Sequence, residues 1–468
     1  MEFTLYNKLQ PVCDFEISAA GKIEKILKVH NAAYAPVGVN LQDKISLYEW
    51  WKGRSIPASR IGIDQFLREV GLESTTVLPL RSFGLSLSDQ YWIKPAGSSI
   101  TWEEINFFQH DFSTDVGEAF FQDSIVSDKI NLLSPNNTSD GWLRKKWIKE
   151  GEQTFLVKSG KKLLPIEGYN EVLAFKLAEK LGLKHVLKYS LLQDELQGAC
   201  SICRNFITPD TELVSAYALL TAHPQPKGTN IYDGLLKLGQ RLDIPGMEEY
   251  LDDMLVLDYL IANEDRHLGN FGFIRDVNTL QYLGPAPIFD NGTSLWCNSR
   301  ESKLGEAVKA KPFFTSHEQQ LALVKHWESY DFSGLAEAGD IVAEVFASAN
   351  EEECSAKRKK LLTQAVRERV QAISLYQARR QGKLSHAVIV KELQQLKMNT
   401  EPIFYYYLQR QGVQSLKYNP DLDKKLIAAL LKDGFSIEQC KRIMLNSPHL
   451  KSSQHVETLL KSEMRNID

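Results

Sequence analysis

The sequence predicts an α+β chain of two lobes that is followed by an extra helical C-terminal region. Three observations predict this organisation. Strand-like runs lie on both sides of a helical pattern within residues 142–207, and apolar helical patterns follow from residue 248 onward. Residues 380–468 show further helical patterns that are broken at glycines and prolines. At 468 residues the chain is long enough for about three domains.

The composition excludes several classes of protein. The hydrophobic fraction is 43% and the charged fraction is 24%, as in ordinary globular proteins. No apolar run approaches the ~20 residues of a membrane-spanning helix, and the N-terminus lacks the pattern of a signal peptide. Six sparse cysteines do not suggest a disulfide framework. We therefore expect a cytoplasmic protein that does not contact a membrane.

Charge is distributed unevenly along the chain. Residues 351–468 carry 21 Lys and Arg against 13 Asp and Glu, whereas the first 350 residues carry 34 against 46. Such a basic region can bind an acidic partner such as DNA, but it is more simply a solvated helical face. Within it, residues 426–440 indicate two short helices around Gly434, which fits a helix-turn-helix or any small helical bundle.

The chain is expected to divide into four segments. They are a mixed α/β N-terminal region at 1–130, a strand-rich lobe at 131–207, a mostly helical lobe at 208–380 and a helical appendage at 381–468.

The strand-rich lobe begins with a turn-rich stretch at residues 134–141, where Ser, Asn, Asp, Pro and Gly all favour turns. Cys200 and Cys203 are expected to pack as small apolar side chains, because positions i and i+3 of a strand face opposite sides. The expected elements are a hairpin at 142–148 and 153–158, a helix at 171–181, and strands at 186–192 and 199–207.

The helical lobe contains one apolar helix pattern from Glu248 to Ile261. A second hairpin is expected at 271–275 and 279–283. After Trp296 the sequence reads as largely helical to about residue 380.

The chemically informative residues lie in the polar stretches around this second hairpin. They offer the carboxylate of Asp265, the amide of Asn270 five residues later and the carboxylate of Asp290 beyond the hairpin. In phosphoryl transfer one carboxylate orients or deprotonates the attacking hydroxyl, while an amide oxygen and another carboxylate hold Mg²⁺ against the phosphates. Any one of these residues alone is more simply a turn or a helix cap. Their order and spacing together favour a kinase site.

A cationic counterpart lies upstream. Lys158 is near the end of a predicted strand, thirteen residues before Glu171 on the following helix. A lysine that contacts nucleotide phosphates and is held by a helix glutamate completes such a site, although an isolated pair is usually a surface ion pair. The turn-rich residues 134–141 precede this strand and could lay backbone amides over the phosphates.

The stretch Asn263–Asn270, which reads N-x-D-R-H-x-x-N, and the segment Pro287–Asp290 resemble the catalytic and metal-binding loops of the HipA-like serine/threonine kinases. This family is a bacterial branch of the protein-kinase-like fold and is distantly similar to the phosphatidylinositol kinases. The order of parts matches over about residues 130–375, whereas residues 1–130 resemble the family only loosely. The resemblance implies a two-lobed, protein-kinase-like fold, with the strand-rich lobe as kinase N-lobe and the helical lobe as C-lobe.

The resemblance also implies roles for individual residues. Asp265 would be the catalytic base or hydroxyl-orienting group, and Asn270 and Asp290 would hold Mg²⁺. Lys158 would contact the phosphates of ATP, and Glu171 would pair with it. We therefore take Asp265, Asn270 and Lys158 as the catalytic set.

Four further residues are implied to serve the nucleotide. Arg204, Asn205 and Phe206 would form the hinge whose backbone holds adenine. His267 would shape the catalytic loop.

Ser139 and Gly141 belong to the implied phosphate loop. Family members can carry a regulatory autophosphorylated serine in this loop, and Ser134, Thr138 and Ser139 are the candidates here. The loop is rich in Asn and Ser rather than Gly, and residues 289–291 read Phe-Asp-Asn. The switch behaviour of ordinary protein kinases is therefore not implied.

These observations predict a Mg-ATP-dependent kinase that transfers the γ-phosphoryl group to a hydroxyl, preferentially a Ser or Thr of a protein substrate or of the chain itself. Two alternatives stay open. One is a weakly active or inactive nucleotide-binding scaffold that binds DNA or a protein through its basic C-terminal region, and the other is a lipid or small-molecule kinase. The family resemblance also implies a small antitoxin-like or DNA-binding partner. Residues 380–468 lie outside the resemblance, and DNA contact by residues 381–468 is the less favoured interpretation of their basic charge.

Overall fold

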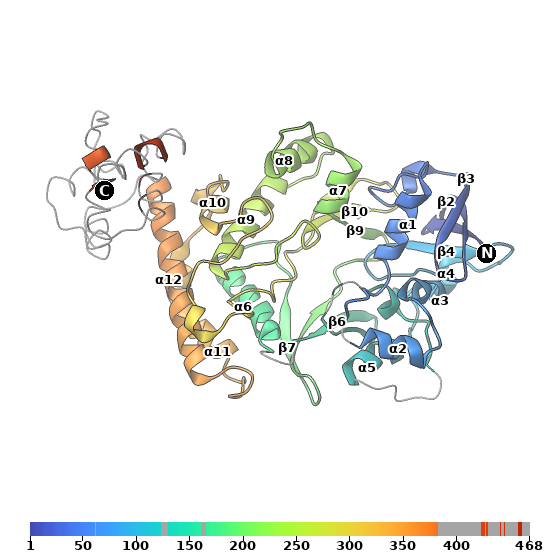
Figure 1. Ribbon diagram of the computed structural model, residues 1–468, viewed down its shortest axis with the longest axis horizontal. Helices are drawn as coiled ribbons and strands as arrows, with labels where there is room; N and C mark the ends of the chain where they lie inside the picture. The colour runs from blue at the N-terminus through green and yellow to red at the C-terminus, as the bar shows by residue number, and fades with distance from the viewer. Residues whose placement is uncertain are drawn as a thin grey trace. The chain divides into compact units, whose positions relative to one another are not determined.

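A computed structural model describes most of the chain (Figure 1). The described residues are 1–60, 62–122, 130–139, 141, 143–160, 165–381, 423–425, 427–428, 440, 444 and 457–460. The chain forms two compact units, residues 1–370 and 371–468, and the features below belong to the first unit, apart from residues 371–380 at the end of α12. Most of the expected helix-turn-helix at 426–440 lies outside the described residues. No helix in the described part has the length and apolarity needed to cross a bilayer.

The described strands form three antiparallel sheets, with orders β3-β2-β1-β4, β5-β6-β8-β7 and β11-β10-β9. Their bounds are β1 Glu2–Asn7, β2 Gln10–Ile17, β3 Ile23–Val29, β4 Tyr91–Pro95, β5 Lys145–Glu150, β6 Gln153–Ser159, β7 Tyr189–Asp194, β8 Gly198–Arg204, β9 Thr211–Ser215, β10 Gly272–Asp276 and β11 Tyr282–Pro285.

Helices pack against these sheets and form most of the C-terminal half of the first unit. Their bounds are α1 Lys44–Gly53, α2 Ile63–Glu69, α3 Leu78–Arg81, α4 Trp102–Ile105, α5 Asp115–Gln122, α6 Glu167–Lys180, α7 Ala216–Ala222, α8 Ile231–Arg241, α9 Met247–Leu260, α10 His317–Leu321, α11 Ala338–Val345 and α12 Ala356–Arg380. Helices occur together with purely antiparallel sheets, which confirms the α+β class.

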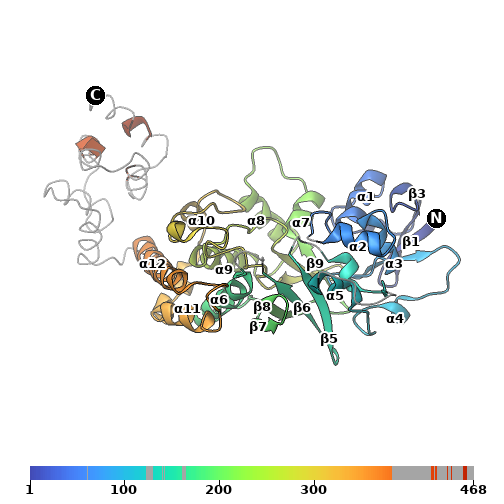
Figure 2. The same ribbon diagram turned by 60° about the horizontal axis from the view of Figure 1, so that its bottom comes forward.

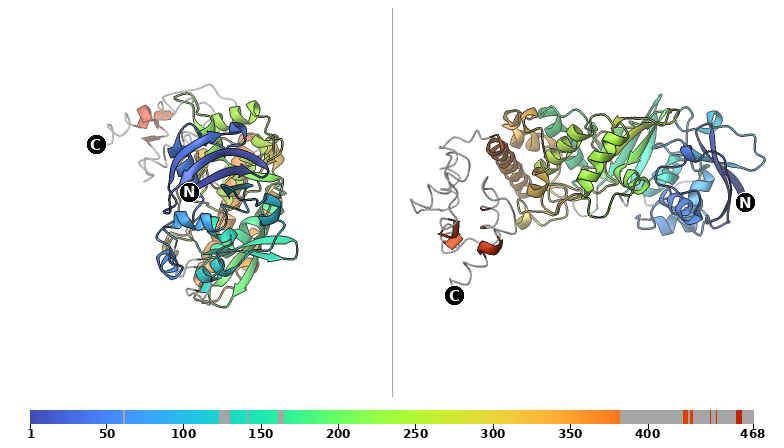
Figure 3. Two further views of the ribbon diagram at one scale, coloured as in Figure 1. Left: turned by 90° about the vertical axis from the view of Figure 1, so that its right-hand side faces the viewer. Right: turned by 90° about the horizontal axis from the view of Figure 1, so that it is seen from above.

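The first sheet lies at one end of the first unit (Figure 3). Alternate residues of β1 and β2 point into a core that also holds Trp51 of α1 and Ile93 of β4. This period of two is what buries one face of an antiparallel sheet.

The second sheet carries the predicted hairpin and helix (Figure 2). The strands β5 and β6 pair so that Lys145 lies opposite Lys158. The helix α6 begins at Glu167, four residues before the predicted start, because its first turn is buried against β8. Gly168 permits this close approach, since a Cβ there would lie 3.1 Å from the carbonyl oxygen of Ala199.

The third sheet contains a strand that the sequence pattern did not reveal. This strand, β9, pairs with β10 of the predicted second hairpin. Gly272 is required at the crossing, because a Cβ would lie 2.3 Å from the carbonyl oxygen of Val214. Beyond Trp296 the chain is less helical than predicted: residues 304–316 are irregular, and α10 and α11 are short.

The N-terminal region contacts the connection between the two lobes. Asn205, directly after β8, donates from Nδ2 to the carbonyl oxygen of Leu87 at 3.0 Å. The amide of Leu213 in β9 donates to the carbonyl oxygen of Ser88 at 3.0 Å. Segments more than 100 residues apart in sequence are therefore held together at the hinge.

A buried ion pair lies at the same boundary. Arg275 of β10 donates to Glu212 of β9 at 2.6 Å, and both side chains are buried. The hydroxyl of Tyr91 in β4 lies 3.4 Å from the guanidinium. The first sheet thus covers a charged pair that belongs to the third.

Candidate active site

Lys158 is the point where three elements of the site meet. Its Nζ lies 3.2 Å from Oε1 of Glu171 on α6 and 2.8 Å from Oδ1 of Asp290. Lys158 and Glu171 are buried, whereas the side chain of Asp290 is 41% exposed. The structure therefore brings together three of the predicted residues, with the acidic group nearest to solvent at Asp290.

Burial and the neighbouring charges shift the pKa values of the three groups in this cluster. Burial alone would lower the pKa of Lys158, but the carboxylates of Asp290 and Glu171 raise it well above its usual value. Burial would raise the pKa of Asp290, but Lys158 and then Lys145 hold it well below its usual range. Burial outweighs Lys158 at Glu171 and raises the pKa of that carboxyl. The cluster thus presents an ammonium and an ionised Asp290 at neutral pH.

The backbone around Asp290 is fixed in an uncommon conformation. Asp290 has φ 58°, in the left-handed region that few residues other than Gly, Asn and Asp adopt. The amide of Asn291 donates to Oε2 of Glu171 at 2.8 Å, and Asn170 donates to the carbonyl oxygens of Gly292 and Ser294. The helix α6 therefore positions both Lys158 and the segment that carries Asp290.

The loop after α9 carries Asp265 and Asn270. The amide of Asp265 donates to Oδ1 of Asn263 at 2.9 Å, and Nδ2 of Asn270 donates to the carbonyl oxygen of Asp265 at 2.9 Å. Asn263 in turn donates to Asp258, near the end of α9, at 2.8 Å. The two Asn side chains close the loop on itself and leave the side chain of Asp265 half-buried at its surface.

Arg266 joins this loop to the segment that carries Asp290. Its side chain is fully buried and is paired with Asp258 of α9. From there it donates to the carbonyl oxygens of Asn270 and Phe289, at 2.9 and 2.5 Å. The distance between the two predicted magnesium ligands is therefore set by a rigid, buried guanidinium.

Asp265 has a cationic partner that the sequence did not indicate. Nζ of Lys311 lies 2.8 Å from its Oδ1, and both side chains are partly exposed. His267 is exposed, and its Nδ1 accepts a hydrogen bond from the amide of Gly269 at 3.1 Å. This contact is of the loop-shaping kind predicted for His267.

The predicted hinge residues follow β8 directly. The amide of Asn205 donates to the carbonyl oxygen of Thr154 at 2.8 Å, and Arg204 is exposed. The ring of Phe206 lies 5.9 Å from that of Phe289, next to Asp290. The hinge and the metal segment are thus neighbours, while contact with adenine stays a prediction.

The turn-rich stretch is more enclosed than a loop over phosphates would need to be. Ser134 and Ser139 are buried: the first donates to the carbonyl oxygen of Ser113 at 2.6 Å and the second to that of Asn136 at 2.9 Å. Thr138 donates to the carbonyl oxygen of Leu85 at 2.9 Å. Phosphorylation of any of the three stays a prediction, and it would require these contacts to open.

Arg60 of the N-terminal region holds the end of this stretch. It is 2% exposed and donates to Oγ of Ser139 at 2.8 Å and to the carbonyl oxygen of Gly141 at 2.7 Å. Gly141 has φ 90°, which a residue with a side chain rarely adopts. A nucleotide role for Ser139 and Gly141 stays a prediction.

Sequence reasoning missed several residues that the fold brings to the cluster. Lys145 is one, and the pairing of β5 with β6 could have revealed it, because residues directly opposite in a sheet share a face. Tyr189 is another: its ring lies 5.6 Å from Nζ of Lys158, and its hydroxyl is 3.4 Å from the amide of Asp290.

The residues present fit a Mg²⁺ ion that is shared with a nucleotide. Nδ2 of Asn270 is engaged by the loop, which leaves its side-chain oxygen for a cation, and Asp290 is ionised and partly exposed. In the described part of the chain no group of three or more His, Cys, Asp or Glu could hold a metal. The protein alone thus offers few ligands, as is usual where phosphates and water complete the shell.

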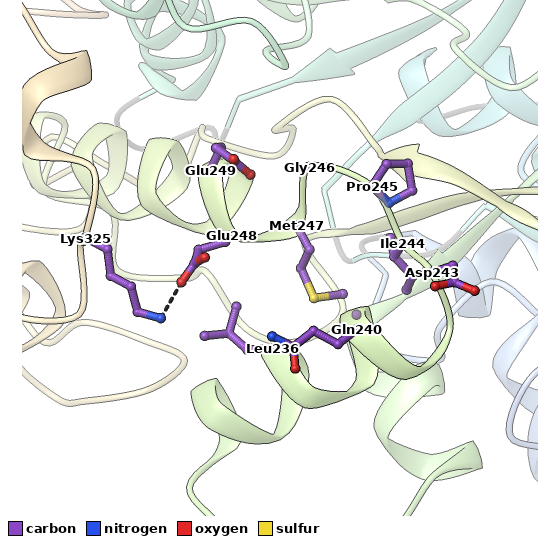
Figure 4. Close-up of a pocket in the computed structure, with 11 residues that line it drawn as sticks. Leu236, Gln240, Asp243, Ile244, Pro245, Gly246, Met247, Glu248, Glu249 and Lys325 are labelled. Atoms are coloured by element: carbon purple, nitrogen blue, oxygen red, sulfur yellow. Dashed lines mark hydrogen bonds and ion pairs between the residues drawn. The ribbon is translucent and has the colours of Figure 1, made fainter.

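Two other features contribute nothing to this chemistry. Cys200 and Cys203 are buried free thiols, and burial raises their pKa values to about 12 and about 11, so they are unreactive. A cavity of about 450 Å³ between α8 and the start of α9 is lined by none of the predicted site residues (Figure 4). Its acidic Glu248 is ion-paired with Lys325.

Comparisons with known proteins identify a family and several similar proteins. A model of the family described as HipA-like C-terminal domain matches residues 126–373. The Helicobacter pylori serine/threonine-protein kinase CtkA is 32% identical over 134 residues, which are 27% of this chain and 40% of CtkA. The chain thus covers less than half the length of that relative.

Two solved structures are similar at low identity. The Helicobacter pylori proinflammatory kinase CtkA matches 49% of this chain and 95% of its own, at 18% identity and a TM-score of 0.35. HipA of Shewanella oneidensis, solved with HipB and operator DNA, matches 79% of this chain and 97% of its own, at 13% identity and a TM-score of 0.45.

Proposed function

Because the chain belongs to the family of the HipA-like C-terminal domain, through residues 126–373, we propose that it is a Mg-ATP-dependent kinase that phosphorylates Ser or Thr of a protein. The observation that carries the proposal is the convergence of two carboxylates on Lys158, whose Nζ lies 3.2 Å from Oε1 of Glu171 and 2.8 Å from Oδ1 of Asp290. Kinase chemistry needs such a lysine beside a metal-binding carboxylate.

Some of these residues act on the nucleotide, and others act on the acceptor hydroxyl. Lys158, held by Glu171, attracts the phosphates of ATP. Asp265 accepts the proton of the acceptor hydroxyl, whose oxygen forms the new bond to the γ-phosphorus. The bond from that phosphorus to the β,γ-bridging oxygen breaks, and its electron pair leaves with ADP. Arg266 fixes the separation between the loop that carries Asp265 and the segment that carries Asp290.

Asn270 and Asp290 would hold Mg²⁺. Bound there, the ion would supply charge neutralisation at the phosphates. The remaining catalysis is positioning by groups that are already ordered by hydrogen bonds, which costs no reorganisation during the reaction.

The phosphoryl acceptor and the partners are also proposed, and both proposals come from the similar proteins. A protein substrate follows from the serine/threonine kinase activity named for CtkA, and a small antitoxin-like or DNA-binding partner follows from the HipB and DNA named in the HipA structure. Residues 381–468, for which DNA contact is the less favoured interpretation, lie almost wholly outside the described residues.

Intact mass spectrometry after incubation with Mg-ATP tests the activity, first on the chain itself and then on a degenerate Ser/Thr peptide library. We expect a gain of phosphate with wild type and none with Asp265→Ala. The matched measurement is calorimetric binding of Mg-ADP, which Asp265→Ala should retain. Transfer by Asp265→Ala at the wild-type rate would refute the role of Asp265, and absence of transfer by wild type to either acceptor would refute the proposed activity.

A further inference from the structure

Lys311 contacts the proposed base from a segment far away in sequence. Its Nζ lies 2.8 Å from Oδ1 of Asp265, 46 residues earlier in the chain. Among the described residues Lys311 is the side chain that binds this carboxylate, while the other polar contacts of Asp265 use its backbone. The pair leaves Oδ2 of Asp265 as the oxygen that can receive a proton.

The ion pair has little value for stability. The side chains of Lys311 and Asp265 are 50% and 38% exposed, and exposed ion pairs of this kind are screened by solvent and contribute little to stability. Their exposure instead leaves both groups accessible to a substrate. A stabilising role therefore does not explain why the chain brings this lysine to Asp265.

The backbone that carries Lys311 is firmly held. Gln320 of α10 is buried, donates from Nε2 to the carbonyl oxygen of Lys311 at 2.8 Å and accepts from the amide of Phe313 at 3.2 Å. The ring of Phe313 packs edge-on against Phe271, which directly follows Asn270. The anchor of Lys311 is thus attached to the same loop that carries Asp265.

We propose that Lys311 is a positioning residue that holds the carboxylate of Asp265 toward the acceptor hydroxyl during phosphoryl transfer. The proposal rests on the kinase function proposed above. Lys158 is committed to Glu171 and Asp290 at the nucleotide end, so Lys311 supplies the cation at the acceptor end. It neither gains nor loses a proton in the step. Its contribution is to keep Oδ2 within hydrogen-bond reach of the hydroxyl, as proton transfer requires.

The test compares Lys311→Met, Lys311→Arg and the control Lys309→Ala, an exposed lysine of the same segment. Turnover is measured with Mg-ATP and the peptide library, and nucleotide affinity with Mg-ADP by calorimetry. Loss of alignment should lower kcat of Lys311→Met by about 100-fold, because a shift of about 1 Å costs that much. Its affinity for Mg-ADP should stay within about threefold, and Lys311→Arg should recover to within about tenfold of wild type. Lys309→Ala should behave as wild type.

A double-mutant cycle identifies the residue through which Lys311 acts. In single-turnover reactions, Lys311→Met should slow an Asp265→Asn enzyme no further, because its target is already gone. An equal slowing in both backgrounds would overturn the proposal. So would unchanged turnover of Lys311→Met in an active enzyme, or faster turnover, which would mean that Lys311 masks Asp265. If wild type itself transfers nothing to the library or to itself, the proposed function fails and this inference falls with it.

Discussion

Arg266 meets Asp258 through two parallel hydrogen bonds, from Nε to Oδ2 at 3.1 Å and from Nη2 to Oδ1 at 3.0 Å. Neither side chain is exposed to solvent. Its Nη1 donates to the backbone at Asn270 and Phe289, and its Nη2 also donates to Oδ1 of Asn291. One buried pair therefore connects the helix α9, the loop of Asp265 and the segment of Asp290.

Breaking this pair should damage stability and activity together. Asp258→Asn leaves a buried guanidinium without its counter-charge, and we expect the free energy of unfolding to fall by about 3–5 kcal/mol in urea denaturation. The matched control is Asp276→Asn at the end of β10, which keeps its acceptor oxygen and should change stability by less than about 0.5 kcal/mol. A similarly small effect at Asp258 would contradict the role given to Arg266.

Asp290→Asn should abolish the dependence of nucleotide binding on Mg²⁺. In wild type, calorimetry with and without a chelator should show that Mg²⁺ strengthens ADP binding. In the variant, the factor by which Mg²⁺ strengthens ADP binding should be more than about tenfold smaller than in wild type. Even changes in outer-shell groups lower metal affinity by that much. Glu171 still pairs with Lys158, so the variant should stay folded. An undiminished effect of Mg²⁺ would remove Asp290 from the ligand set.

Asp253 should make stability depend on pH. Burial raises its pKa to about 6, against opposing hydrogen bonds that include one from Tyr330 at 3.0 Å. Between about pH 4 and 6 the folded protein binds more protons than the unfolded chain, so the free energy of unfolding falls as pH rises through this window. Asp253→Asn should be the more stable protein above about pH 6, with the advantage shrinking toward pH 4. Denaturation curves at several pH values measure this difference, and a pH-independent gap would refute it.

Arg60→Lys should loosen the end of the turn-rich stretch. A lysine cannot reproduce the planar set of bonds to Ser139 and Gly141, so we expect the free energy of unfolding to fall by about 2 kcal/mol. If Gly141 contacts the nucleotide, the KM for ATP should rise as well. The exposed Arg81→Lys serves as control in the same denaturation and kinetic measurements. Unchanged stability of Arg60→Lys would show that the contacts are not needed.

The order of chemical groups along the chain was enough to predict the centre of the candidate site. Lys158 and Glu171 meet because a strand and the next helix pack together, which the local pattern already indicates. Asp290 joins them because the second hairpin returns the chain, as its turn residues predict. These contacts follow from neighbouring elements, whose sequence signals are strong.

Lys311 and Arg60 could not be predicted in this way. Their contacts depend on tertiary packing of irregular segments, and no periodicity or turn signal in the sequence carries that information. The strand β9 was missed for a related reason: it is short, and its partner β10 lies about 60 residues later. The helical content after Trp296 was overestimated; at residues 311–313, for example, the Gln320 side chain binds the backbone of Lys311 and Phe313 by hydrogen bonds and so replaces bonds within a helix.

The contacts of the N-terminal region with the hinge determine how much of the chain has to stay together. The family match begins at residue 126, yet the buried Glu212–Arg275 pair is covered by Tyr91, and Asn205 binds the backbone at Leu87. A truncation or gene fusion that delivered only the matched region would expose a charged pair and leave a hinge side chain without its acceptor. The segment that sequence comparison recognises is therefore smaller than the segment whose contacts bury this pair and hold the hinge.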